Sequence, residues 1–430
     1  MSREQLVAMA KRNLEFGKRG SVDLADAIVR VPASNYFSPE RWEQEMQAVF
    51  RRLPLTLAFS AELPNPGDYK AMEVLDTPVL IARGADGVVR AFVNSCSHRG
   101  AVVVAEGTGN ARRFACPYHA WTYDQEGALV GVLDREAFGD FDMSCMGLAP
   151  LSASERCGII FVTLRAEPTV DIDTFLSGYD EMLNHLALED CRVVGSQTIA
   201  GPNWKVAYDG YLDLYHLPIL HKNSFGPDMP NKAVYDVWGP HQRASSPAKF
   251  ALSGTEEPNI HDWPVEKLTS GVWTIFPHVS IASFDAEGRV FMVSVLLPGS
   301  DPGSSATVQT FLHSQPDAPG QAESIAKTMA FLHHVVQDED YFTGLRLQKA
   351  LRTGAKTDVL FGRNEGGGQR FHRWVDTLLA TDDIDVSALF KADLPARLPT
   401  SVGGTTAEPL VCELTNAPHD RKSMNGDRLP

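Results

Sequence analysis

The sequence predicts an α+β protein in which a β-rich region precedes a larger region that combines strands with helices. Between about residue 55 and residue 164, short apolar and β-branched runs alternate with turns that contain glycine, as is typical of an antiparallel sheet. On either side of that region, residues 39–52 and 204–216 carry helix-like patterns, and the second begins at a possible N-cap, Asn203. A chain of 430 residues is long enough for about two or three domains.

Two hairpins are predicted within the β-rich region. The first joins Thr77–Arg83 to Val88–Val93 through four turn residues, of which two are glycines. The second joins residues 121–123 to residues 128–131, and the apolar run 158–164 closes the region as one more strand. Each hairpin adjoins a loop that contains a cysteine and a histidine, so these loops are expected at strand ends.

The two loops carry candidate metal ligands. Cys96 and His98 lie in the first loop, and Cys116 and His119 lie in the second. Two thiolates and two imidazoles suit either a zinc ion or a Rieske-type [2Fe–2S] cluster, in which two histidines replace two cysteines on one iron. A zinc finger usually groups its cysteines in one loop and its histidines in another. Here each loop supplies one of each, which favours the cluster and leaves zinc and a chance grouping as alternatives.

A second group of polar residues follows the β-rich region. On one continuous helix, Asp209, Asp213 and His216 would share a face, and Pro218 would break the helix before His221. Such a break would let the two histidines converge on one metal ion. Iron(II) that activates O₂ is commonly bound by two histidines and one carboxylate. The alternative is an amphipathic helix whose polar residues are simply exposed to solvent.

Both groups of residues resemble the same family. The segments CSHRGA and CPYHAWTY, together with NWKVAYDGYLDLYHLPILH, are similar to motifs in the large subunits of Rieske non-haem iron ring-hydroxylating oxygenases. Respiratory Rieske proteins carry an extra cysteine in each loop, and here Ala101 and Tyr118 take those places. The resemblance covers about residues 40–385. It implies a Rieske-type antiparallel β domain placed before a helix-grip (START-like) catalytic domain with an antiparallel sheet and long helices.

The resemblance also assigns roles to individual residues. It implies that the [2Fe–2S] cluster is bound by Cys96, His98, Cys116 and His119. It further implies that His216 and His221 bind a mononuclear iron. Asp213 would be a catalytic bridge, hydrogen-bonded to an iron-ligand histidine of its own chain and to His119 of the partner subunit.

The third iron ligand is expected in the acidic run 338–340. Family members often place a glutamine eight residues after this ligand, and Asp340 and Gln348 have that spacing. Asp338 and Glu339 are close enough to compete with Asp340, which is the favoured candidate. Asp209 is expected either near the iron or in a plain capping or exposed position.

By this resemblance, the chain is the terminal oxygenase component of an enzyme system. It shows no Gly-rich dinucleotide fingerprint, so electrons would come from a separate NAD(P)H-dependent reductase, with or without a ferredoxin. They would pass through the cluster to Fe(II), where O₂ would be used to hydroxylate a small substrate. Cis-dihydroxylation in aromatic hydrocarbon catabolism is the first expectation. The alternatives are monohydroxylation or oxidative O- or N-demethylation, then a Rieske electron carrier without oxygenase activity, then a zinc-stabilised ligand-binding module.

Composition and charge narrow the expected partners and location. The net charge of −15 argues against nucleic-acid binding. No apolar run approaches the length of a membrane span and the amino terminus lacks a signal-peptide core, so a cytoplasmic protein is expected. The resemblance implies a head-to-tail homotrimer, possibly with an additional β subunit. The expected division is a helical segment 1–40, a Rieske domain 41–165, a catalytic domain 166–400 and a polar tail 401–430.

Overall fold

The computed structural model describes residues 2–247, 259–392 and 394, which build two large antiparallel sheets and the helices packed on them. The predicted tail 401–430 lies outside the described residues. In the described part of the chain, no helix has both the length and the apolar character needed to cross a lipid bilayer.

The first large sheet is formed by residues 55–163. Its seven strands, in spatial order, are β2 (Leu55–Phe59), β11 (Ile159–Thr163), β10 (Pro150–Arg156), β5 (Val89–Val93), β4 (Thr77–Arg83), β3 (Asp68–Val74) and β6 (Gly107–Asn110). A small sheet beside it contains β7 (Arg113–Ala115), β8 (Thr122–Asp124) and β9 (Leu129–Gly131). Both predicted hairpins and the predicted closing strand are confirmed. In the first hairpin Arg83 pairs with Val89, and Gly87 has a φ of +81°, a conformation that favours glycine.

The second large sheet carries the rest of the fold. Its strands, in spatial order, are β12 (Arg192–Gly201), β18 (Ser305–His313), β17 (Arg289–Pro298), β16 (Val279–Asp285), β15 (Val272–Ile275), β14 (His241–Ser245) and β13 (Val234–Trp238). Strands β13 to β18 therefore form a meander, and β12 joins it beside β18. A long helical run packs on β12 and consists of α9 (Gln321–His334), the π-helical segment η9 (Val335–Tyr341) and α10 (Phe342–Leu351).

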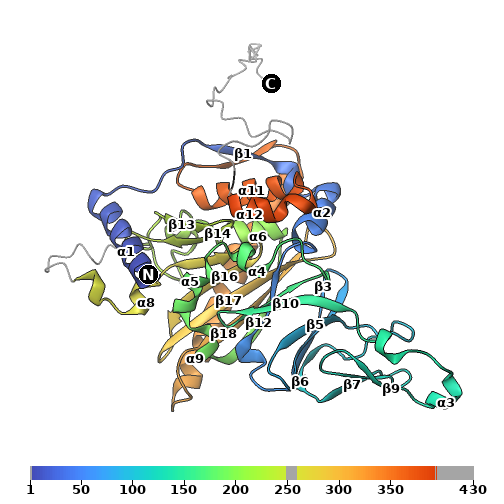
Figure 1. The fold of residues 1–430 in the computed structure, drawn as a ribbon. Coiled ribbons are helices and arrows are strands. Elements are labelled where there is room, and N and C mark those ends of the chain that lie inside the picture. Colours follow the sequence, from blue (N-terminus) through green and yellow to red (C-terminus); the bar gives the residue numbers. More distant parts are fainter. Residues whose placement is uncertain (1, 248–258, 393, 395–430) are drawn as a thin grey trace, which may run out of the picture.

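The remaining elements cover and connect the sheets. They are α1 (Ser2–Arg19), β1 (Val29–Pro32), η1 (Ala33–Tyr36), α2 (Pro39–Glu45), η2 (Met46–Phe50), η3 (Ser60–Glu62), α3 (Arg135–Phe138), η4 (Met143–Cys145), α4 (Ile172–Leu176), α5 (Asp180–Leu183), η5 (Asn184–Leu186), η6 (Leu188–Asp190), α6 (Trp204–Asp209), α7 (Leu217–Leu220), η8 (Ile260–Asp262), α8 (Val265–Leu268), β19 (Asp358–Phe361), α11 (Gly366–Leu379), η10 (Asp383–Asp385) and α12 (Val386–Ala392). Strand β1 pairs with β19, and α1 contacts α5, α8 and β13. Figure 1 shows the small sheet and α3 at the lower right, and the second large sheet at the centre beneath α11 and α12.

The two large sheets share one apolar core. Leu55 and Ile160 from the first sheet and Val293 from the second belong to a single cluster of buried side chains. A hydrogen bond crosses the same boundary, because the backbone N–H of Thr56 donates to Nε2 of the buried His278 at 3.1 Å. This arrangement of an antiparallel sheet followed by a second antiparallel sheet with packed helices confirms the predicted α+β class.

A buried ionic network fixes the beginning of α6. The carboxylate of Glu45, at the end of α2, pairs with Lys205 and accepts a hydrogen bond from the indole N–H of Trp204 at 2.9 Å. Arg41 binds the other carboxylate oxygen of Glu45 at 2.7 Å. Asn203 caps α6 as predicted, since its side chain accepts from the backbone N–H of Lys205. These contacts determine the direction in which α6 leads into the following loop.

The prediction of one helix over residues 204–216 is wrong in its extent. Helix α6 ends before Gly210, a residue with poor helix propensity. The carboxylate of Asp213 then accepts the backbone N–H of His216 at 3.2 Å and that of the preceding residue at 2.6 Å, a local turn that competes with the helix. Pro218 does not break a helix either. It lies in the first turn of α7, where proline is tolerated.

Candidate metal centres and substrate cavity

Three residues predicted as iron ligands lie together in the structure. His216 and His221 flank α7, and Asp340 projects from η9. The Oδ1 atom of Asp340 is 3.3 Å from Nε2 of His221 and 3.8 Å from Nε2 of His216. The donor atoms of the three residues all lie within 4.8 Å of one another, and no other group of three His, Cys, Asp or Glu residues in the described part of the chain is as compact. Two imidazoles and one carboxylate in this arrangement fit Fe(II) and leave further positions open.

The π-helical segment η9 points the side chains of the three neighbouring acids in different directions. Such segments are rare in proteins, and those that occur often lie at functional sites. Asp338 points to the exposed His334, whose Nδ1 lies 2.7 Å from its carboxylate. Glu339 contacts Nδ1 of His221 at 2.7 Å, and only Asp340 faces Nε2 of both histidines. Each acid therefore has a different task, and Asp340 is the one placed to bind a metal ion.

Each histidine is held through the ring nitrogen that faces away from the shared centre. Nδ1 of His216 lies 2.9 Å from Oδ1 of Asp213, and Nδ1 of His221 contacts Glu339, which also accepts from the hydroxyl of Ser224 at 2.7 Å. A carboxylate on the far nitrogen fixes the orientation of a metal-binding imidazole and increases its basicity. The sequence predicts Glu339 only as a competitor of Asp340 for the metal ion. Its position next to Asp340 is the signal in the sequence that points to a role at this site.

The electrostatics of this site favour a cation. Burial lowers the pKa of His221, but the hydrogen bond and charge of Asp340, followed by those of Glu339, outweigh burial and raise it overall. The carboxylates that raise this pKa would stabilise a metal cation in the same position.

Asp209 belongs to a different network, so the predicted common face with Asp213 and His216 is wrong. Its carboxylate accepts from the hydroxyl of Tyr36 at 2.8 Å and lies 2.9 Å from Nε2 of His372. Tyr36 and His372 are buried, and they contact each other at 3.0 Å. Because α6 ends at Asp209, the chain turns before Asp213, and the two carboxylates point in different directions.

Gln348 forms hydrogen bonds with the backbone of two neighbouring segments. Its side-chain oxygen accepts from the backbone N–H of Asn203 at 2.5 Å, and its amide donates to the carbonyl of Gly303 at 2.9 Å. The glutamine eight residues after Asp340 thus joins the helical run to the beginning of α6, and through it to the loop that carries His216.

The four predicted cluster residues lie on two loops that have the same pattern of backbone hydrogen bonds. The N–H of Cys96 donates to the carbonyl five residues later at 2.8 Å, and the N–H of Gly100 donates back to Cys96 at 2.8 Å. The second loop repeats both bonds, from Cys116 to Trp121 at 2.8 Å and from Ala120 to Cys116 at 2.9 Å. The two loops therefore present their cysteines in matching conformations.

The donor atoms of these loops fit a cluster better than one ion. Both cysteines are buried, and the rings of His98 and His119 lie 4.6 Å apart. Nδ1 of His98 is buried without a hydrogen-bond partner among the described residues, as expected of an atom that binds a metal. The four residues contain no compact group of three donors of the kind that a zinc ion requires. Trp121 stacks on His98 at 4.9 Å and shields it on one face.

A cavity of about 260 Å³ opens beside His216, His221 and Asp340. Its apolar lining residues are Leu214, Leu217, Phe225, Met229, Val272, Ala282, Phe284, Met292, Leu332, Val335 and Val336. Leu217 and Phe225 are in the lining, and β17 contributes Met292, whereas Leu220 is not part of it. None of the described residues in this lining is a lysine or an arginine.

Comparison with known families identifies both parts of the chain. The model of the Rieske [2Fe-2S] domain matches residues 54–141, and that of the ring hydroxylating alpha subunit (catalytic domain) matches residues 188–381. These ranges contain all the residues that form the two candidate centres.

Three similar proteins show the range of chemistry among relatives. The carnitine monooxygenase oxygenase subunit of Acinetobacter baumannii is 33% identical over 253 residues, which are 58% of this chain and 67% of that protein. The anthranilate 1,2-dioxygenase large subunit of Acinetobacter baylyi is 31% identical over 50% of this chain and 48% of its own. The glycine betaine monooxygenase oxygenase subunit of Chromohalobacter salexigens is 30% identical over 48% of this chain and 45% of its own. The match thus spans about half the length of the latter two relatives.

Solved structures share the fold. The apo form of a quaternary ammonium Rieske monooxygenase has a TM-score of 0.68 at 22% identity, over 83% of this chain and 96% of that chain. Naphthalene 1,2-dioxygenase from Rhodococcus sp. has a TM-score of 0.66 at 21% identity, over 89% of this chain and 100% of that chain. The chain therefore belongs to the large-subunit family of Rieske ring-hydroxylating oxygenases, with a Rieske [2Fe–2S] domain and a catalytic domain for mononuclear iron.

Proposed function

We propose that this chain is a terminal oxygenase that hydroxylates an apolar, aromatic group, with cis-dihydroxylation as the expected outcome. The observation that carries this proposal is the cavity beside His216, His221 and Asp340, whose lining is mainly apolar and includes Phe225 and Phe284. Transfer of a neutral ring from water to such a lining is favourable, whereas an isolated charge would lose its hydration there.

Each residue near the two centres has a proposed task. His216, His221 and Asp340 bind the iron, and the four cluster ligands are Cys96, His98, Cys116 and His119. When bound, the iron supplies open positions for O₂ and the cluster supplies electrons one at a time. The side chains of the chain itself do the positioning: Asp213 and Glu339 orient the histidines, and the apolar lining excludes water from the reacting group.

The electron donor and the assembly are part of the same proposal. Electrons come from an NAD(P)H-dependent reductase, with or without a ferredoxin. In a head-to-tail homotrimer, Asp213 would bridge to His119 of the partner subunit, and a β subunit is compatible with that assembly. Partial exposure of Asp213 and the exposure of Tyr118, next to the second cluster loop, support contacts at these positions. We assign residues 41–165 to the Rieske domain and residues 166–400 to the catalytic domain.

The second candidate is insertion of one oxygen atom, including oxidative demethylation. Its support is the similarity to the carnitine and glycine betaine monooxygenases. A cation could also contact aromatic faces in the cavity, where Phe225 and Phe284 stack with ring centroids 6.4 Å apart.

Product mass after reaction with ¹⁸O₂ distinguishes these candidates. The holoenzyme, with iron and sulfide contents measured, is supplied with a reductase and with neutral arenes, arene carboxylates and quaternary ammonium compounds. We expect an arene product that gains two labelled oxygen atoms and two hydrogens. A product with one labelled oxygen would refute dihydroxylation. A failure of all three classes to stimulate O₂ consumption would refute the oxygenase assignment for these substrates.

A further inference from the structure

The cavity beside His216, His221 and Asp340 is called the iron cavity below. A second cavity, of about 320 Å³, adjoins it. Five residues line both cavities: Leu214, Leu217, Met229, Gly271 and Val272. Ala10, Asn13 and Leu14 of α1 also line the second cavity, so this space extends from the iron cavity to the amino-terminal helix. A molecule longer than one ring could occupy both cavities at once.

Unpaired polar atoms gather on this second cavity. Four of the thirteen buried side-chain atoms without a hydrogen-bond partner among the described residues belong to its lining, namely Arg243 Nη1, Trp263 Nε1, Ser246 Oγ and Asn13 Oδ1. Buried polar groups are nearly always hydrogen-bonded, and those that are not need an explanation. Three of the four can donate a hydrogen bond, which suits an anionic acceptor.

Arg243 is the strongest of these groups. Its side chain is only 2% exposed, its Nε donates to the carbonyl of Ser270 at 3.1 Å, and its guanidinium lies 5.0 Å from the ring centroid of Trp273. Asp236 lies opposite Arg243 on the neighbouring strand, but its carboxylate hydrogen-bonds to Arg12 at 3.3 Å. Within 4 Å, no carboxylate of the described residues forms an ion pair with Arg243. A buried cation that lacks a close counter-ion is costly, so an anion placed beside it would be stabilised.

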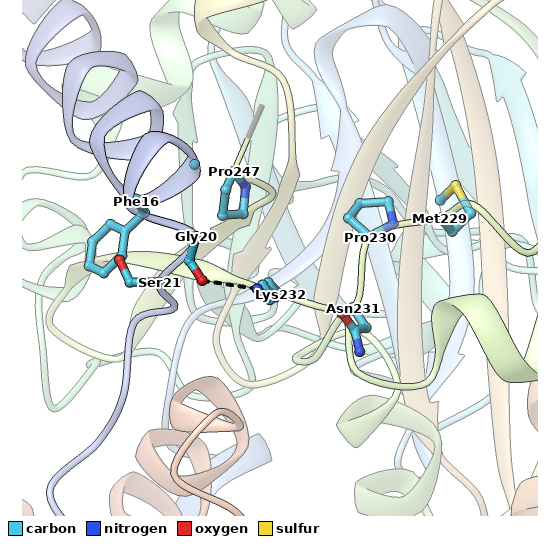
Figure 2. A pocket seen from close by; sticks show the side chains of 9 residues that line it. Phe16, Gly20, Ser21, Met229, Pro230, Asn231, Lys232 and Pro247 are labelled. Carbon is cyan, nitrogen blue, oxygen red and sulfur yellow. Dashed lines mark hydrogen bonds between the residues drawn. The ribbon is translucent and has the colours of Figure 1, made fainter. Parts of the chain in front are cut away.

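An outer hollow shares Met229 and Pro230 with the second cavity. It has a volume of about 170 Å³ and lies between the end of α1 and the segment 229–232. Figure 2 shows Phe16, Gly20 and Ser21 on one side of the hollow and Met229 and Pro230 on the other, with Lys232 bonded to the carbonyl of Gly20. Met229 lines the hollow, the second cavity and the iron cavity, so it lies where all three meet.

We infer that the second cavity binds a carboxylate at one end of the substrate, while the apolar part of the same molecule extends into the iron cavity. Arg243 Nη1, Trp263 Nε1 and Ser246 Oγ donate hydrogen bonds to the carboxylate. A charge-assisted bond from a guanidinium is stronger than a neutral one, so Arg243 contributes most to the preference for an acid. This inference rests on the proposed function, since it assumes that the hydroxylated group lies in the iron cavity.

Arg243→Met tests the inference, because methionine retains an unbranched apolar side chain and removes the charge. Binding to the holoenzyme is measured by titration calorimetry without reductant, with ω-phenylalkanoates from phenylacetate to 6-phenylhexanoate and with their neutral amides. We expect at least one acid to bind more tightly than its amide to the unaltered enzyme. Arg243→Met should weaken binding of that acid by about ten- to a hundredfold and leave binding of the amide within about twofold. Arg243→Lys should recover part of the loss.

Arg289→Met is the matched control. Arg289 also lies over an aromatic ring, 4.4 Å from the centroid of Phe291, but it lines none of the three cavities. The Arg289→Met variant should bind the acid with the same affinity as the unaltered enzyme. The inference is overturned if no acid is preferred over its amide, if Arg243→Met binds acid and amide as the unaltered enzyme does, or if Arg289→Met causes the same loss. Turnover of the neutral amides is a separate measurement: its absence would count against the proposed function, while the binding data would still decide the inference.

Discussion

Replacing Glu339 by alanine removes the group that orients His221. The Oε2 atom of Glu339 accepts from Nδ1 of His221 and from the hydroxyl of Ser224, each at 2.7 Å. His221 is 3% exposed, so water has little access to replace the lost acceptor. We therefore expect the imidazole to lose its fixed orientation toward Asp340 and to bind iron less tightly.

The expected magnitude follows from these contacts. Loss of a carboxylate that orients a metal-binding histidine typically weakens metal affinity 10- to 100-fold, which corresponds to about 1.4–2.7 kcal/mol. Leaving a buried N–H without an acceptor costs about 1–3 kcal/mol, which is the same range. Glu339→Gln should lie between the alanine variant and the unaltered protein, because its amide oxygen can still accept from His221 but carries no charge.

Asp338→Ala is the matched control for this experiment. Asp338 also contacts a histidine Nδ1 at 2.7 Å, that of His334, but the two side chains are 53% and 59% exposed. Such exposed pairs contribute little. Each holoenzyme is equilibrated with increasing concentrations of a chelator, and iron per chain is measured with the visible absorption of the cluster as an internal reference. The reasoning is refuted if Glu339→Ala retains iron as the unaltered protein does, or if Asp338→Ala loses iron equally.

Three further predictions concern the bridge, the buried ion pair and pH. Asp213→Ala should retain the visible spectrum of the cluster but lose roughly tenfold or more of the turnover, because Asp213 holds Nδ1 of His216; full activity would contradict its bridging role. Glu45→Ala leaves the fully buried cation of Lys205 without its partner and should lower the free energy of unfolding by about 3–5 kcal/mol in urea titration, whereas an unchanged midpoint would argue against this. Burial lowers the pKa of His278 to about 4, so the folded protein holds this residue neutral while the unfolded chain protonates it near its ordinary value. Its stabilisation is complete above about pH 6.5 and falls by about 3 kcal/mol as the pH drops toward 4, so His278→Gln should show a smaller decrease in Tm over that range, and an equal decrease would rule this out.

The sequence alone was sufficient for the features that depend on short separations along the chain. The hairpins and the ligand loops were predictable, because glycine turns and alternating strands act over a few residues and each loop contains its own cysteine and histidine. The proximity of His216 and His221 was predictable for the same reason, since they flank a single turn of helix. The extent of the preceding helix was not predictable, because the pattern alone did not reveal that α6 would stop before Gly210 and that the side chain of Asp213 would bind the backbone of the following turn.

Only the tertiary structure decided which of the distant groups meet. Asp338, Glu339 and Asp340 are adjacent in the sequence and have nearly the same local pattern. The π-helical segment η9 nevertheless directs the first to His334, the second to Nδ1 of His221 and the third to Nε2 of His221. The contact between His221 and Glu339 spans 118 residues, and that between Asp209 and His372 spans 163. No periodicity in a sequence encodes separations of this length, because they result from the packing of helices against a sheet. The same packing places Arg243, on strand β14 next to the edge of the second sheet, beside a cavity that shares lining residues with the cavity at His216, His221 and Asp340.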